Sequence, residues 1–138
     1  MVKNADFSYY YSVGGRVMFG ETSAETVLRE VYEETQVTME IERLAFVHEN
    51  FFLWEIGNQP YHEIAFFYRV KPEKNQSLAA LRCHSRGEGG GAESLHWLPL
   101  DKLSDYPLFP EFFKTELLNP TEDVGHFITK DEITFRVK

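Results

Sequence analysis

The chain has 138 residues, a net charge of −8 at pH 7 and one cysteine, Cys83. This length fits one domain with a hydrophobic core, expected here over residues 1–138, and no apolar run reaches the roughly 18 residues needed to span a membrane. The negative charge argues against a nucleic-acid polymer as partner, while a single cysteine excludes an internal disulfide and fits a reducing cytoplasm.

The first part of the chain predicts short β segments followed by a glycine loop. Residues 1–3 have the character of a strand end, residues 4–6 of a turn, and residues 7–13 are aromatic and β-prone. Gly14-Gly15 permits backbone conformations that bulkier residues resist. Residues 17–20 then predict a short strand that ends in a glycine turn.

A well-marked helix follows this loop. Thr22 and Glu25 have the spacing of a capping box, in which each side chain bonds to the other residue's backbone N–H. Apolar side chains recur at positions i, i+3, i+4 and i+7 and form one buried face: Ala24, Val27, Leu28 and Val31. Gln36 comes where a helix often ends in a left-handed glycine, and we expect about 1 kcal/mol of strain there.

Three carboxylates gather on one flank of this helix. Glu30 lies three positions before Glu33 and four before Glu34, so their side chains are neighbours. Like charges at this spacing cost roughly 0.2–0.5 kcal/mol per pair, and a divalent cation turns that repulsion into binding because hard cations take carboxylate oxygens. Arg29 and Glu33 are able to pair. The arginine is either a helix-surface ion-pair partner or a residue that orients the acidic cluster.

The spacing across residues 15–37 resembles the Nudix box. The positions that carry the resemblance are Gly15, Glu21, Arg29, Glu30, Val31, Glu33, Glu34 and Val37. Two positions depart from the family's pattern, because Gln36 replaces a glycine and Val13 replaces a proline. The Trp-Leu-Pro-Leu run at residues 97–100 is also similar to the corresponding Nudix element.

The resemblance implies an α+β Nudix fold, an α/β/α sandwich in which helices enclose a mixed β-sheet. Nudix domains usually have a full strand before the glycine loop. Here only residues 1–3 have the character of a strand end, so we expect a truncated first strand. An uncovered sheet edge at that place would favour a homodimer.

The resemblance also implies an activity, the Mg²⁺-dependent or Mn²⁺-dependent hydrolysis of the diphosphate linkage in a nucleoside diphosphate derivative. It puts the metal on Glu30 and Glu34, with Glu33 nearby and the Gly14 carbonyl as a further ligand. Supporting positions are Gly15, Glu21 and Arg29.

The general base of the implied reaction stays open between Glu30 and a loop glutamate. Catalytic residues are expected among Glu30, Glu33 and Glu93, and Glu88 is a second loop candidate. The alternative reading is a Nudix-fold module that binds nucleotides or regulates another process without catalysis.

Downstream of the helix we expect a long antiparallel hairpin and several short elements. The predicted segments are strands at 38–54, 61–71 and 94–98, a short helix from 99–103, a second helix at 111–118 and a terminal hairpin of 126–129 with 133–137. Glu49 and Glu63 interrupt the apolar strands, and each either faces solvent or is directed at a site.

The aromatic side chains of the hairpin are either core residues or a stacking surface for a base. They are Phe51, Phe52, Trp54, Tyr61 and Phe67. The five histidines lack the paired spacing of a zinc site. The sequence therefore predicts the reaction class, and it does not select one nucleotide.

Overall fold

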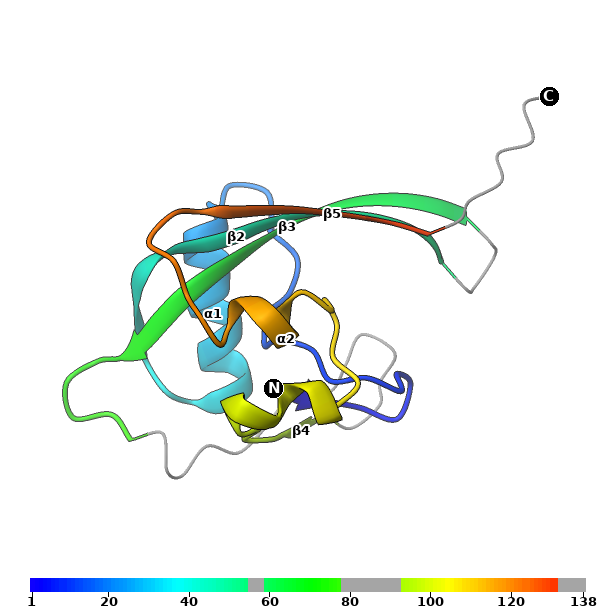
Figure 1. Cartoon of the computed structure of the whole chain (residues 1–138). Helices are drawn as coiled ribbons and strands as arrows, with labels where there is room; N and C mark the ends of the chain where they lie inside the picture. Colours follow the sequence, from blue (N-terminus) through cyan, green and yellow to red (C-terminus); the bar gives the residue numbers. More distant parts are fainter. Residues whose placement is uncertain (55–58, 78–92, 132–138) are drawn as a thin grey trace.

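The computed structural model describes residues 1–54, 59–77 and 93–131 (Figure 1). Its elements in chain order are β1 (Val2–Lys3), α1 (Ser23–Thr35), β2 (Met39–Trp54), β3 (Gln59–Pro72), β4 (Ser94–Leu95), the 3₁₀ helix η2 (Leu100–Asp105), α2 (Phe113–Glu116) and β5 (Gly125–Lys130). None of the described helices is long and apolar enough to cross a membrane.

The predicted long hairpin is confirmed. β2 and β3 pair antiparallel from Met39↔Pro72 to Trp54↔Gln59. β5 lies on the other side of β2 and runs parallel to it, which makes the sheet mixed, with the order β3-β2-β5. The predicted terminal hairpin has its first strand, at 126–129, within β5. Its second strand, at 133–137, lies outside the described residues.

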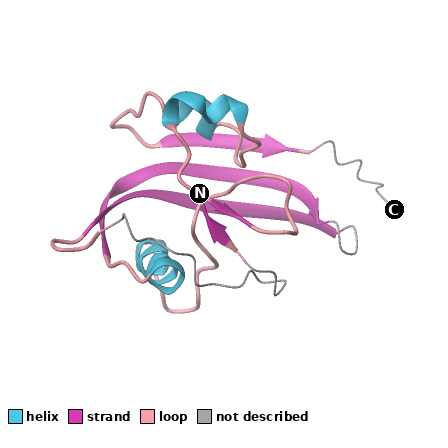
Figure 2. Ribbon diagram, turned by 90° about the horizontal axis from the view of Figure 1, so that it is seen from below, coloured by secondary structure: helices cyan, strands magenta, loops and turns pink. Residues whose placement is uncertain are grey.

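Helical segments cover both faces of this sheet, as the α/β/α prediction requires (Figure 2). Val70 of β3 packs against the α1 side, where Val31, Val37 and Met39 form a buried cluster. Phe67 lies three positions away, so its side chain points to the opposite face, where it packs near Phe113 of α2. Residues on the two faces of β3 thus pack into two separate cores.

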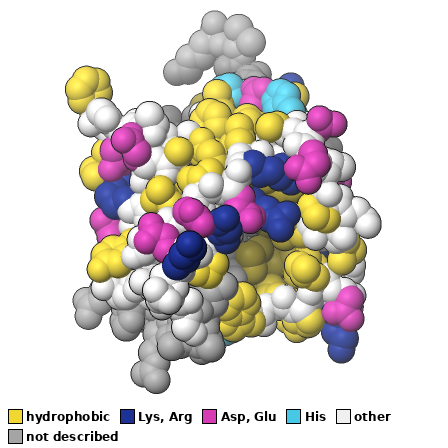
Figure 3. Space-filling view, turned by 90° about the vertical axis from the view of Figure 1, so that its left-hand side faces the viewer, with side chains coloured by type: hydrophobic (Ala, Val, Ile, Leu, Met, Phe, Trp, Pro, Cys, Tyr) yellow, Lys and Arg dark blue, Asp and Glu magenta, His cyan; other side chains and the backbone are white. Residues whose placement is uncertain are grey.

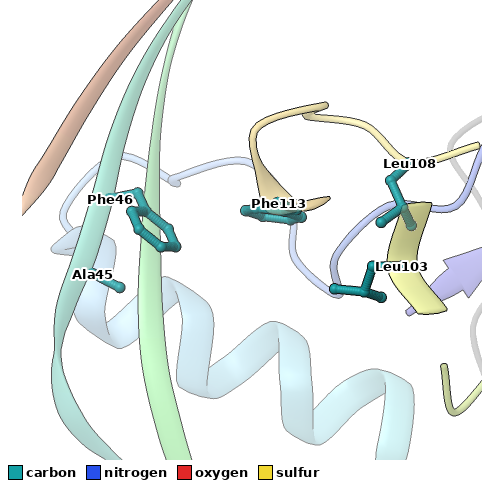
Figure 4. Close-up of a cluster of buried hydrophobic side chains, with 5 residues drawn as sticks. All are labelled: Ala45, Phe46, Leu103, Leu108 and Phe113. Carbon is teal, nitrogen blue, oxygen red and sulfur yellow. The ribbon is translucent and has the colours of Figure 1, made fainter. Parts of the chain in front are cut away.

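The larger core lies on the α2 side of the sheet. Figure 4 shows Phe46 and Ala45 of β2 facing Phe113, with Leu103 and Leu108 beyond it. Phe112 stacks on Phe127 of β5 at a ring-centroid distance of 4.0 Å, which joins the helical segment to the parallel strand.

The first strand is a stub, as expected. β1 has two residues and pairs antiparallel with β4, as Val2↔Leu95 and Lys3↔Ser94, in a small sheet separate from the main one. The β-prone segment 7–13 is not a strand, because its only ladder contacts among the described residues are the single bridges Val2↔Tyr11 and Tyr10↔Leu108.

Three other elements differ from their predicted lengths or types. Residues 17–19 form no strand, because the described part of the chain offers them no partner strand, and their side chains are exposed. The strand predicted at 94–98 is only the two residues of β4. The helix predicted at 111–118 narrows to the single turn of α2, whose N-cap residue, Phe112, has no capping side chain.

Cross-strand ion pairs occupy the end of the hairpin nearest α1. Arg69 Nε lies 2.7 Å from Glu42 Oε2, and Lys71 Nζ lies 3.0 Å from Glu40 Oε1. Acidic and basic side chains are intermingled on the face shown in Figure 3. On this face the negative charge of the chain is therefore locally balanced rather than gathered into one field.

Candidate active site

The predicted capping box is present at the start of α1. Thr22 has extended backbone angles, φ −82° and ψ 159°, and its hydroxyl accepts from the Glu25 backbone N–H. The Glu25 carboxylate in turn accepts from the Thr22 backbone N–H at 2.8 Å, a bond that lowers the pKa of Glu25. The helix therefore begins at a fixed residue, and this fixes the turn on which each following carboxylate lies.

Glu21 and Arg29 bind the glycine loop to the helix. Arg29 donates to both Glu21 oxygens, at 2.7 Å from Nε and 3.0 Å from Nη2, and Nη2 also reaches the Arg16 carbonyl at 3.4 Å. Glu21 further accepts from the Thr26 hydroxyl and the Met18 backbone N–H. The guanidinium lowers the pKa of Glu21 to about 2, so this carboxylate is ionised wherever the protein is folded near neutral pH.

Arg29 also contacts the acidic cluster itself. Its Nη1 lies 2.7 Å from Glu30 Oε1 and 3.4 Å from Glu33 Oε2. The ion pair of Arg29 with Glu33 is thus present, and the same guanidinium also contacts the Glu30 carboxylate, while its role in orienting the cluster stays a prediction. Glu33 is the more exposed of the two acids, with 57% of its side chain accessible against 18% for Glu30.

Gly15 is needed because the Glu30 carboxylate packs on its backbone. A Cβ placed on Gly15 would lie 2.3 Å from both Cδ and Oε1 of Glu30. This is far inside van der Waals contact, so any side chain at this position displaces the Glu30 carboxylate. The glycine therefore determines where an acidic group lies, in addition to the shape of the loop.

Glu34 differs from the other acids of the cluster because it is buried. Only 7% of the residue is exposed, and within the described residues its Oε2 has no hydrogen-bond partner. Burial, followed by the neighbouring charges of Glu93 and Glu30, raises the pKa of Glu34 to about 7, although a hydrogen bond from the Gly14 backbone partly offsets them. An anionic oxygen without a partner is an unusual feature of a folded core, and it points to a cationic ligand.

Glu93 comes to this cluster from far along the chain. It directly precedes β4, and its Oε1 accepts a 2.7 Å hydrogen bond from the Tyr11 hydroxyl. Among the neighbouring charges, that of Glu93 raises the pKa of Glu34 the most. The structure thus brings the loop glutamate near the helix acids, whereas Glu88 lies outside the described residues.

The hairpin glutamates have other surroundings. Glu49 bridges two histidines from the neighbouring strands, with His126 Nε2 at 2.9 Å from Oε1 and His62 Nε2 at 3.2 Å from Oε2. Glu63 is exposed. Neither contributes a described contact to Gly14, Glu30 or Glu34.

The hairpin aromatics also lie apart from the acidic cluster. Phe67 belongs to the larger core, while Phe52, Trp54 and Tyr61 contact one another at the far end of the hairpin, and Phe51 stacks on His62 at 4.0 Å. A cavity of about 520 Å³ lies elsewhere, and its lining includes Tyr9, Phe109, Phe112 and Thr129. Sequence analysis had not predicted this cavity, because residues separated by more than 90 positions line it.

The donor set of the cluster fits a hard divalent cation. Its side chains are all carboxylates, and within the described residues the buried Oε2 of Glu34 has no hydrogen-bond partner. No three acidic, histidine or cysteine side chains of the described residues are already gathered as a metal-binding group. Among the contacts described, Glu30 Oε1 instead lies 2.7 Å from Arg29 Nη1.

One residue of the site escaped the sequence analysis altogether. Tyr11 appeared only as a member of a β-prone aromatic run, yet it bonds to Glu93 across 82 positions. No local spacing signals such a contact.

Comparison with known proteins agrees with the motif. A family model described as NUDIX domain matches residues 1–117, which is most of the chain. No curated protein matches it.

Proposed function

The chain belongs to the Nudix family, and we propose that it is a metal-dependent hydrolase that cleaves the diphosphate linkage of a nucleoside diphosphate derivative. The observation that carries this proposal is Glu34, a buried carboxylate with one oxygen that has no hydrogen-bond partner among the described residues, on which the charges of Glu93 and Glu30 act. A group with this raised pKa is costly for the metal-free fold, and a bound cation repays that cost.

The residues that would hold the cation are Glu30 and Glu34, with Glu33 nearby and the Gly14 carbonyl as a further ligand. Bound Mg²⁺ or Mn²⁺ would neutralise phosphate charge and make a water molecule more acidic. Carboxylate oxygens are the ligands that both ions accept.

The protein's own groups then perform three tasks. Glu21 and Arg29 hold the glycine loop against α1 through bonds of 2.7 and 3.0 Å, so that Gly14 and Gly15 keep their places beside the acids. Arg29 also sets the resting position of Glu30. Glu93 takes a proton from the attacking water. At the same time the water oxygen bonds to phosphorus, and the bond between that phosphorus and the bridging oxygen breaks.

Glu93 is the base we favour over Glu30. The Glu30 carboxylate is held by Arg29 at 2.7 Å and is also assigned to the cation, which leaves it fewer lone pairs for a proton. Glu93 has a tyrosine hydroxyl on one oxygen and comes from a different part of the chain. A base on a separate segment is able to approach the water from another side than the cation does.

We assign the nucleoside end of the substrate to the aromatic cavity. Its volume of about 520 Å³ lies within the usual range for small-molecule sites. Tyr9, on its wall, contacts the ring of Tyr11 at 6.4 Å, and Tyr11 bonds to Glu93. Tyr9 and Tyr11 thus connect the wall of the cavity to Glu93 through side-chain contacts.

The rival function is a Nudix-fold module that binds nucleotides without hydrolysing them. The observation in its favour is that Arg29 already pairs with the carboxylates of Glu30 and Glu33. The two functions differ in whether products form, because a binding module protects its ligand and leaves it intact.

The test is Mg²⁺-dependent release of phosphate-bearing products from a panel of nucleoside diphosphate derivatives. We expect Glu34→Gln to lower turnover by about 100-fold or more. The substitution removes a carboxylate charge that would hold the cation, and such a cation stabilises the transition state by several kcal/mol. Glu63→Gln is the matched control, because Glu63 is an exposed strand residue away from the cluster. Absence of turnover across the panel would contradict the hydrolase, and full activity of Glu34→Gln would contradict the site.

We also place this activity in the cytoplasm, on the evidence of a single cysteine in 138 residues. A homodimer through the sheet edge beside β1 remains a prediction. Sedimentation equilibrium of the full chain tests it.

A further inference from the structure

The Tyr11 hydroxyl lies between two side chains in a short relay. Asn4 Nδ2 donates to it at 2.9 Å, and the hydroxyl lies 2.7 Å from Glu93 Oε1. All three side chains are partly buried, so water competes with these bonds less than at an open surface.

The proton of the hydroxyl is directed at Glu93. The Asn4 carboxamide oxygen already accepts from the backbone N–H groups of Asp6 and Phe7, at 3.1 and 2.9 Å, so its NH₂ group must be the part that faces Tyr11. An amide NH₂ is only a donor and occupies a lone pair of the hydroxyl. The single O–H of Tyr11 is thus left for the carboxylate, as a charge-assisted hydrogen bond.

The backbone on both sides of this bond is fixed to the same two-residue strand. Tyr11 exchanges two backbone hydrogen bonds with Val2, at 2.7 and 3.0 Å, and Val2 is completely buried. Lys3 pairs with Ser94, the residue directly after Glu93. β1 therefore sets the distance between the tyrosine and the glutamate, although these are 82 positions apart in the chain.

The ring of Tyr11 is held independently of its hydroxyl. It contacts Phe7 edge-on at 5.8 Å and Tyr9 at 6.4 Å. Removing only the hydroxyl oxygen leaves these aromatic contacts in place, which makes the relay separable from the packing of the segment.

We infer that Tyr11 is a positioning residue, which, oriented by Asn4, holds the carboxylate of Glu93 at the acidic cluster in the orientation that the reaction uses. This inference rests on the proposed function, in which Glu93 takes the proton from water. It gives the short first strand a task, since β1 keeps the relay together. It also predicts that the hydroxyl of Tyr11 matters for turnover without touching the substrate.

The test compares Tyr11→Phe, Glu93→Gln and the double variant with the wild-type chain, on the best substrate of the panel. We expect Tyr11→Phe to lower kcat by about tenfold with KM changed less than twofold, because a carboxylate that has lost the Tyr11 hydrogen bond spends less time in the productive orientation. The double variant should be no slower than Glu93→Gln alone, since Tyr11 affects the reaction only through the Glu93 carboxylate. Tyr10→Phe is the matched control, the same loss of one oxygen on the neighbouring residue, and should retain wild-type kcat and KM.

Two kinetic results would overturn the inference. One is wild-type kcat in Tyr11→Phe beside an impaired Glu93→Gln, and the other is a double variant whose loss is the product of the two single losses. A fall of kcat that follows a lowered melting temperature would indicate a merely structural role.

Crystal structures of the wild-type chain and Tyr11→Phe separate this inference from the proposed function. We expect the Glu93 carboxylate to leave its wild-type position in the variant. An unchanged Glu93 would refute the positioning role even if no substrate were turned over, whereas a wild-type chain that hydrolyses nothing would refute the proposed hydrolase alone.

Discussion

The carboxylates at the two ends of α1 have opposite surroundings. At the N-terminal end, Glu21 accepts four hydrogen bonds, from Arg29, Thr26 and Met18, and its pKa falls to about 2. At the C-terminal end, Glu34 is buried with an unpartnered oxygen within the described residues, and its pKa rises to about 7. One carboxylate is fully hydrogen-bonded by its described neighbours, and the other is not.

This difference teaches how a single helix combines rigidity with reactivity. The fully bonded end holds the glycine loop in place and stabilises the fold. At the other end, the buried carboxylate of Glu34 destabilises the fold, and the remaining structure offsets this destabilisation. Strained or uncompensated groups of this kind concentrate at functional sites.

The largest effect on stability is expected from replacing the buried carboxylate of Glu34. The folded-state pKa of Glu34 lies above its unfolded value of 4.5, so its favourable contribution is fully present below pH 4.5 and is lost as pH rises through about 7. We expect this group to lower the free energy of unfolding of the metal-free chain by on the order of 2–3 kcal/mol between pH 4.5 and 8. Glu34→Gln should remove this loss, as measured by urea unfolding in a chelator.

Glu21→Gln provides the opposite control. Its folded-state pKa lies below the unfolded value, so the stabilisation by Glu21 is present above pH 4.5 and is lost as pH falls through about 2. The Gln variant should be less stable than wild type at pH 7 and converge with it in acid. The same pH dependence for both variants would refute the contrast between the two ends of the helix.

A smaller effect is expected from Gly15→Ala, which changes where Glu30 lies. The new methyl group would meet the end of a flexible side chain at 2.3 Å, so the carboxylate moves and the backbone need not. We expect about a tenfold loss of kcat with the free energy of unfolding within about 1 kcal/mol of wild type.

Gly20→Ala is the matched control for Gly15→Ala. Gly20 has φ +95° with nothing within 4 Å of a built Cβ, so alanine there strains the backbone without touching an acid. It should lose roughly 1 kcal/mol or more of stability and retain kcat. Equal kcat in both variants would show that the position of Glu30 does not matter.

The smallest effect is expected at the end of the helix. Gln36 is left-handed, with φ 59° and ψ 24°, as its place in the motif predicts. Gln36→Gly should stabilise the chain by about 0.5 kcal/mol, because the relief of backbone strain outweighs the loss of the exposed side-chain bonds to the Tyr32 and Glu33 carbonyls. Gln36→Ala should be less stable than wild type, since it keeps the strain and loses the side-chain bonds to the Tyr32 and Glu33 carbonyls. Thermal unfolding at pH 7 measures both.

The sequence by itself determined the parts of this protein that depend on local spacing. The capping box of Thr22 and Glu25, the apolar stripe ending at Val31, the left-handed Gln36 and the long hairpin all follow from periodicity and side-chain chemistry within a few residues. The Nudix family followed too, since its motif lies within residues 15–37 and the family model matches residues 1–117.

Only the tertiary structure decided which of these residues are buried and which distant partners they meet. Periodicity put Glu30, Glu33 and Glu34 on one flank of the helix, yet packing alone buried Glu34 and left Glu33 exposed. It also set β5 parallel to β2 and Tyr11 against Glu93, because contacts across about 80 positions depend on how the elements dock and leave no trace in local spacing.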